Sequence, residues 1–154
     1  PDPLLLADRC AAGDLVGAVE CAERIVGLGP GLTPSGDDIL AGLLVTLRLV
    51  GGARDPGGRA VWLAGWLGAA VTADAGTRTT ALAATLLHCA ASGAAGAEVA
   101  AVLRAVAGHE PAAPAVRRLL AAGHTSGADL AAGVQAGCRA ALALSAGGTR
   151  RVSA

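Results

Sequence analysis

Apolar residues recur along this chain at the spacing of a helix. Clusters of β-branched residues with strict alternation are absent, and Gly, Pro or Asp interrupts the apolar pattern about every 12–18 residues. Leu15, Ala22 and Val26 share one helix face, and Asp14 directly before them can supply the N-cap. The pattern therefore predicts an all-α fold.

Eight helices are expected, separated by segments rich in Gly, Pro and polar residues. The sequence predicts them at residues 4–9, 14–26, 35–50, 59–73, 80–92, 97–107, 111–123 and 126–145. Gly51 and Gly52 are expected to end the third helix. We expect a single compact bundle of seven or eight helices over residues 1–146, and a flexible tail at 147–154.

Composition adds two features to this picture. Apolar residues make up 53% of the 154 residues and charged residues 16%, and Ala and Gly are so frequent that tight Ala/Gly-mediated helix packing is expected. The formal net charge is zero, which gives no reason to expect a nucleic-acid or membrane partner. No apolar run is long enough for a membrane span and no signal peptide is visible, so we expect a soluble, cytoplasmic protein.

The positions of the cysteines, tryptophans and histidines predict where these side chains lie in the fold. The four cysteines are scattered without a C-x-x-C pair, which predicts buried free thiols: Cys10, Cys21, Cys89 and Cys138. Trp62 and Trp66 stand four residues apart and indicate a core or subunit-contact stripe rather than a ligand platform. His88 lies in an apolar run and is expected in the core, whereas His109 carries no specific signal.

The most unusual stretch covers residues 27–38, with sequence GLGPGLTPSGDD, and leads directly into an apolar run. Its glycines and prolines force an irregular loop, and the amide groups of such a loop and of a helix start attract anions. The backbone of Gly29, Gly31 and Thr33, with Ser35, is therefore a candidate ligand-binding segment. Asp37 and Asp38 follow in the first helical turn and are candidate catalytic residues.

This stretch has an echo near the C-terminus. Residues 35–42 and 126–133 share the pattern S-G-x-D-x-x-A-G. The three-residue spacing of Ser and Asp suits a capping box, so helix capping is the plain interpretation of Asp38 and Asp129. Gly42 and Gly133 permit close approach of two backbones, and we expect the two helices to begin near each other and to cross there.

The echo also separates candidates for chemistry from candidates for capping. Asp37 is replaced by Ala128 in the second copy, so the cap does not need it, and it is open to a ligand or metal role. His124 precedes the second copy, where the helix dipole favours a neutral ring that can act in acid–base chemistry, and Ser126 can bind a ligand. Both residues have plainer interpretations, a surface histidine and a cap.

A third candidate segment gathers hydroxyl groups and a guanidinium at a helix start. Thr77, Arg78 and Thr79 can form an oxyanion cradle, because Arg binds phosphate or carboxylate with a bidentate fork; a capped surface turn is the alternative. The chain has no Walker A lysine motif, dinucleotide fingerprint, H-E-x-x-H or serine elbow. No metal ligand set is assigned and the cofactor stays open.

Residues 27–38 with the following Ile-Leu-Ala-Gly resemble the AllH-like family, some members of which are linked to oxamate carbamoyltransferase of allantoin degradation. The G-H-T-S-G segment at 123–127 and the Thr-rich segment near Thr77 fit the same pattern, over about residues 15–142. Because members of this family usually carry a further N-terminal part, we expect the likeness to be to their C-terminal helical domain.

The resemblance implies a subunit of an assembly that moves a carbamoyl group between oxalurate and phosphate in purine catabolism. The expected partners are a small anion, such as phosphate, carbamoyl phosphate or an oxalurate-like compound, and other subunits of a hetero-complex or homo-oligomer. Two alternatives stay open: a non-catalytic interaction or scaffold subunit, and a divalent-metal-dependent hydrolase that uses the Asp pair.

Overall fold

The computed structural model describes residues 2–149, of which the side chains of residues 2–146 are placed. This part of the chain is 77% helical and contains nine helices and no strand, which confirms the predicted all-α fold. In order, the helices are α1 Asp2–Ala12, α2 Leu15–Ile25, α3 Ser35–Arg54, α4 Arg59–Thr72, α5 Ala75–Arg78, α6 Ala81–Ala91, α7 Ala97–Val106, α8 Ala112–Leu120 and α9 Ser126–Thr149.

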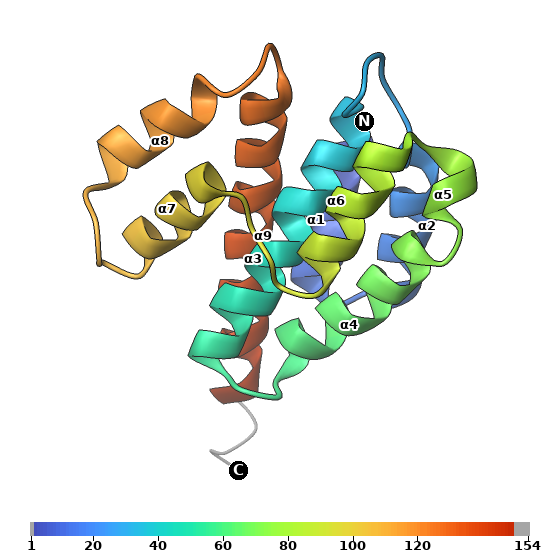
Figure 1. Ribbon diagram of the computed structural model, residues 1–154. Coiled ribbons are helices and arrows are strands. Elements are labelled where there is room, and N and C mark those ends of the chain that lie inside the picture. The colour runs from blue at the N-terminus through green and yellow to red at the C-terminus, as the bar shows by residue number, and fades with distance from the viewer. Residues whose placement is uncertain (1, 150–154) are drawn as a thin grey trace.

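The two long helices α3 and α9 lie side by side at the centre of the molecule (Figure 1). Helices α4, α5 and α6 lie on one side of this pair and α7 and α8 on the other, while α1 packs behind it and α2 packs on α1 and α4. Four leucines of α3 are fully buried: Leu40, Leu43, Leu44 and Leu47. Helix α3 is therefore the core element against which the other helices bury their apolar faces.

Most predicted helix boundaries hold within a few residues; the predicted Asp14 cap of α2 is confirmed, and α6 also has a side-chain cap. The Asp14 carboxylate accepts a hydrogen bond from the Gly17 amide at 2.9 Å, and the Thr80 hydroxyl accepts one from the Ala83 amide at 3.0 Å. The short helix α5 was not predicted. It forms around Ala75, which is fully buried, and closes through the Thr77 amide on the Asp74 carbonyl.

The predicted end of the third helix at Gly51 is wrong. Helix α3 continues to Arg54 because Gly51 is buried and packs on Ala60 of α4, where a Cβ at Gly51 would lie 2.7 Å from the Ala60 Cβ. Gly51 therefore lets α3 and α4 pack closely and does not end the helix. At the C-terminus α9 extends to Thr149, three residues into the predicted tail, and residues 150–154 lie outside the described part.

Three expectations about burial need correction. His88 and Cys89 are exposed on α6 rather than in the core, because the buried face of that helix is carried by Ala83, Ala84 and Leu87. Cys10 and Cys21 are buried free thiols and Cys138 is half-buried. Burial raises the pKa of the Cys10 thiol to about 12, so that thiol stays protonated and unreactive.

Candidate functional site

The first turns of α3 and α9 meet at one end of the molecule. The hydroxyl oxygens of Thr33 and Ser126 lie 2.8 Å apart. Further along, a Cβ at Gly42 would lie 3.2 Å from the Gly133 Cα and would overlap the Leu130 carbonyl oxygen. The predicted crossing of the two helices at Gly42 and Gly133 is therefore confirmed.

The two helices run parallel and in register. Gly42 contacts Gly133, Thr46 contacts Gly137, and the Arg54 side chain donates to the Ser145 hydroxyl at 3.2 Å, and in each pair the residues are 91 positions apart. The echo extends to the helix that precedes each copy. A Cβ at Gly36 would overlap the Ile25 carbonyl at the end of α2, and a Cβ at Gly127 would overlap the Leu119 carbonyl at the end of α8.

Asp37 holds the glycine-rich loop in place. Asp37 as a whole is 2% exposed, and its Oδ1 accepts a hydrogen bond from the Gly27 amide at 2.8 Å. Its Oδ2 accepts one from the Thr79 hydroxyl at 2.5 Å. The two carboxylate oxygens therefore join the loop before α3 to the segment between α5 and α6. Ala128, which takes the place of Asp37 in the second copy of the motif, has no side-chain oxygen that could do the same.

The loop from Leu28 to Leu32 is exposed, and Thr33 after it is half-buried. The Thr80 hydroxyl donates to the Leu32 carbonyl at 2.5 Å and fixes one side of the loop. Gly29 and Gly31 have φ values of 122° and 89°, which glycine adopts without strain. Within residues 2–146 the amides of Gly29, Gly31, Leu32 and Thr33 donate no hydrogen bond to the protein. The loop thus presents backbone donors to solvent.

Asp38 has different surroundings from Asp37. It is 5% exposed, and its Oδ2 is buried without a hydrogen-bond partner in the described part of the chain. Burial raises the pKa of the Asp38 carboxyl, and the negative charges of Asp129 and Asp37 raise it further. The hydroxyl groups of Ser126 and Thr33 oppose these effects by hydrogen bonding. Asp38 is therefore an acceptor, or a proton carrier, without a protein donor for Oδ2.

The capping interpretation of Asp38 is wrong. The N-cap position of α3 is Pro34, and no side chain caps the helix; the Pro34 carbonyl accepts the amides of Asp37 and Asp38 at 3.0 and 3.1 Å. In α9 the Thr125 carbonyl accepts the Asp129 amide at 3.0 Å, and the Asp129 Oδ2 is also buried without a partner. The two aspartates lie where the helices meet and cap neither of them.

The predicted cradle around Arg78 is built differently from expectation. The Arg78 guanidinium donates to the Glu23 carbonyl of α2 and lies 3.7 Å from the Asp74 carboxylate. The Thr77 hydroxyl donates to the Asp74 carbonyl at 2.8 Å. These side chains hold their own turn and tie it to α2. His124 is exposed in the turn before α9.

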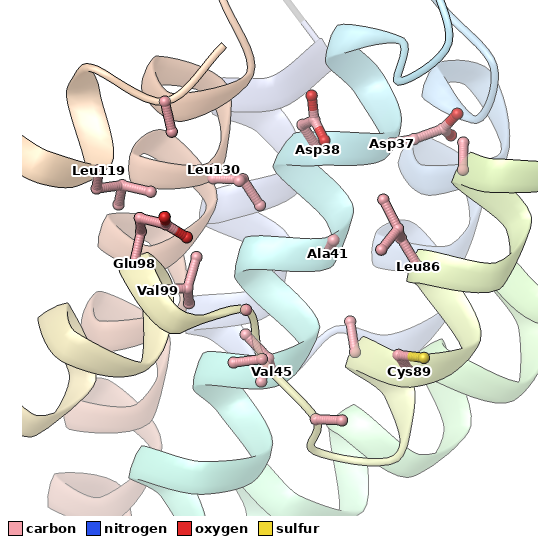
Figure 2. Close-up of a pocket in the computed structure, with 16 residues that line it drawn as sticks. Asp37, Asp38, Ala41, Val45, Leu86, Cys89, Glu98, Val99, Leu119 and Leu130 are labelled. Atoms are coloured by element: carbon pink, nitrogen blue, oxygen red, sulfur yellow. The ribbon is translucent and has the colours of Figure 1, made fainter.

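A cavity of 340 Å³ opens beside Asp37 and Asp38. In Figure 2 these residues of α3 lie at one end of the cavity, Leu86 and Cys89 of α6 on one side, and Glu98 and Val99 of α7 on the other. The remaining lining residues are small or apolar, and no Arg, Lys or His is among them. The cavity therefore suits an uncharged or apolar group near the two carboxyl groups, while an anion fits better at the exposed loop amides.

The sequence reasoning missed Glu98 and did not name Asp129 as a site residue. Nothing in the pattern around residue 98 pointed to the cavity, since α7 approaches α3 only in the folded chain. Asp129 did stand in the repeated S-G-x-D pattern, but this pattern was interpreted as a helix cap. Among the described residues no group of three or more His, Cys, Asp or Glu side chains is placed to hold a metal ion.

Comparison with known proteins gives one family. The family model described as "Oxamate carbamoyltransferase subunit AllH" matches residues 25–138, which include every candidate site residue named above. No curated protein and no solved structure matches. None of the helices in the described part is both long and apolar enough to cross a membrane.

Proposed function

The chain belongs to the family of oxamate carbamoyltransferase subunit AllH, and from this membership we propose that it takes part in carbamoyl transfer between oxalurate and phosphate. In this reaction a phosphate oxygen bonds to the carbamoyl carbon of oxalurate. The bond from that carbon to nitrogen breaks, and the departing oxamate nitrogen takes up a proton. The site must therefore hold an anion, orient an amide and supply a proton.

The exposed loop is the proposed anion-binding segment. Its free amides at Gly29, Gly31, Leu32 and Thr33 stand before the N-terminus of α3, where an oxyanion is favoured by both the donors and the helix dipole. Thr79 supports this segment through its hydrogen bond to Asp37, whose other carboxylate oxygen accepts the Gly27 amide. Arg78 and Thr77 donate to the Glu23 and Asp74 carbonyls, so we assign them to holding the turn before α6 rather than to direct contact with the anion.

The amide end of the substrate is assigned to Asp38. Its unpartnered Oδ2 is a buried acceptor that a carbamoyl N–H group would satisfy, and Thr33 connects it to the loop. Ser35 and Ser126 are the first residues of α3 and α9, and the Ser126 hydroxyl also hydrogen-bonds to the Asp38 carboxyl group. His124, exposed in the turn before α9, is the proposed route for a proton to solvent. The convergence of three sequence segments on the start of α3 is the observation that carries this proposal.

The test uses two glycines with matched geometry. Gly31 and Gly57 have φ values of 89° and 70°, and a Cβ would meet nothing within 4 Å at either position. Gly31→Ala should change the direction of the loop amides, whereas Gly57→Ala should introduce similar backbone strain far from the loop. We expect phosphate and carbamoyl phosphate to shift the NMR amide signals of the loop, and Gly31→Ala to weaken their binding at least tenfold while Gly57→Ala leaves it unchanged.

The same variants are compared in the complete carbamoyltransferase assembly. Gly31→Ala should lower carbamoyl transfer by the factor by which it weakens binding. Equal behaviour of the two variants, or loop amide signals that do not respond to any of these anions, would contradict the proposal.

A second function is favoured by a separate observation. Trp62 and Trp66 are 51% and 59% exposed on the outer face of α4. Such aromatic side chains suit a subunit contact, which a non-catalytic interaction subunit would also need. Stabilisation of the chain by partner subunits, together with no response to phosphate, carbamoyl phosphate or oxalurate, would favour this function. The metal-dependent hydrolase has no such support, and we do not propose it.

A further inference from the structure

The helix register brings two aspartates together at the junction of α3 and α9: Asp38, which is buried, and Asp129, which is half-buried. The contacts between α3 and α9 join residues 91 positions apart, and Asp38 and Asp129 are separated by the same interval. Both stand one turn before the glycines at which the helices touch. Their proximity also shows in the Asp38 carboxyl, on which the charge of Asp129 acts directly.

Each of these carboxyl groups has one oxygen without a hydrogen-bond donor. Oδ2 of Asp38 and Oδ2 of Asp129 are both buried and accept no hydrogen bond from the described residues. Asp38 as a whole is 5% exposed. A buried acceptor without a donor destabilises a fold, and two ionised carboxylates side by side do so more strongly. A proton held between the two carboxyl groups would supply the missing donor and reduce their repulsion.

The surrounding charges indicate how much positive charge the pair requires. Both aspartates are in the first turn of their helix, and the two helix N-termini together contribute the equivalent of roughly one positive charge. Against two carboxylates this leaves about one negative charge to neutralise. Besides Asp38, the charged residues that line the adjacent cavity are Asp37 on α3 and Glu98 on α7, both acidic, and His124 in the turn before α9 is exposed. A single proton restores the balance.

We propose that Asp38 and Asp129 act as one carboxyl pair that shares a single proton at neutral pH. Such a pair offers one O–H donor and one carboxylate acceptor, which is the complement of an amide or carbamoyl group. Resting on the function proposed above, the pair donates its proton to the departing oxamate nitrogen and regains one from the attacking hydrogen phosphate. Asp38 touches the substrate in this scheme, and Asp129 is a positioning residue that keeps the proton available.

The pair predicts a definite dependence of stability on pH. Because the folded-state pKa of Asp38 is raised above its unfolded value, the folded protein binds the proton more tightly. This contribution to stability is complete below the unfolded pKa and is lost as the pH rises through the folded pKa. In Asp38→Asn or Asp129→Asn, the amide group can donate to the remaining carboxylate and replace the shared proton. Both variants should therefore be more thermostable than the unsubstituted chain at pH 8, with a flatter pH profile.

The experiment combines thermal unfolding between pH 4 and pH 9, about the range in which a raised carboxyl pKa acts, with infrared spectroscopy of the folded chain. The unsubstituted protein should show the carbonyl stretch of a protonated carboxyl group at pH 7, and each Asn variant should lose it. Asp8→Asn is the matched control, because Asp8 is an exposed carboxylate paired with Arg139 at 2.7 Å. It should retain both the infrared band and the original pH profile.

Three outcomes would overturn the shared proton. They are an absent carbonyl band, pH profiles of the Asn variants that match Asp8→Asn, and stabilisation by Mg²⁺ or Ca²⁺ that depends on both aspartates, which would make the pair a cation site. None of these readouts requires catalysis. A band that is present without carbamoyl transfer in the complete assembly would refute the proposed function and leave the carboxyl pair standing.

Discussion

The adjacent carboxyl groups of Asp37 and Asp38 differ in what they contact. Asp37 accepts hydrogen bonds from the Gly27 amide and the Thr79 hydroxyl, so both of its oxygens are satisfied by the protein. Asp38 keeps a buried oxygen without a protein donor. One residue therefore shapes the loop, while its neighbour is available to a ligand or a proton.

The role of Asp37 can be measured through stability. Asp37→Ala would leave the Gly27 amide and the Thr79 hydroxyl without their acceptor, and we expect it to lower the free energy of unfolding by roughly 1–3 kcal/mol. Asp37→Asn keeps one acceptor oxygen and gains a donor, so its loss should be smaller. Urea denaturation with Glu20→Ala, an exposed position, as control checks the order of the three variants. A loss for Asp37→Ala no larger than that of the control would contradict this role.

Two residue-level expectations depended on information that the sequence could not supply. Asp37 was distinguished from Asp38 as the residue that the helix cap does not need, but neither side chain caps α3, and Thr79, the partner of Asp37, stands 42 positions away. Asp129 was named as a cap because Ser and Asp had the right spacing. The neighbouring helix, which decides where both aspartates point, is absent from a local pattern.

At the scale of elements, the parallel contact between α3 and α9 determines where the site forms. Gly42 and Gly133 remove the side chains that would keep the backbones apart, and the register then brings Asp38 next to Asp129. The sequence predicted this contact because the same motif occurs twice. It could not predict that Gly51 continues a helix, since a glycine that packs and one that terminates look alike without their neighbours.

Substitution at the crossing tests its importance. A Cβ at Gly133 would overlap the Ile39 carbonyl and lie 2.8 Å from the Leu43 amide nitrogen, so Gly133→Ala must push the helices apart. We expect a loss of about 1–3 kcal/mol in the free energy of unfolding. Gly65→Ala in α4 is the control, because a Cβ there meets nothing within 4 Å. It should instead gain about 0.5–1 kcal/mol from helix propensity. Equal effects of the two substitutions, measured by urea denaturation, would argue against a tight crossing.

At the scale of the whole molecule, three segments far apart in the sequence meet at the start of α3. Thr79 reaches Asp37 and Thr80 reaches the Leu32 carbonyl from one side, while Ser126 reaches Thr33 from the other. The sequence indicated each segment separately by its glycines and hydroxyl groups. Their order in space, and the cavity that α7 closes with Glu98, follow from packing that no local pattern contains.

The outer surface of α4 gives the last prediction. Trp62 and Trp66 are the only two tryptophans, and the chain has no tyrosine or phenylalanine, so its fluorescence reports on this face alone. Both side chains are more than half exposed, which predicts red-shifted emission and strong acrylamide quenching for the isolated chain. If this face is the contact of the subunit with its carbamoyltransferase partners, assembly should shift the emission to the blue and reduce quenching at least twofold.

Two further variants distinguish a contact from a distant effect. Trp62→Gln leaves Trp66 as the reporter of this face. The double variant Trp62→Gln/Trp66→Gln should associate at least tenfold more weakly with the partner subunits, because it removes both aromatic side chains that the contact would bury. Gly65→Ala lies between them on the same helix and adds only a methyl group, so it should assemble normally. If the complex forms with unchanged emission, or if the double variant assembles as tightly as the unsubstituted chain, the contact must lie elsewhere. The loop before α3 is then the next surface to test, because Leu28 and Leu32 are exposed there.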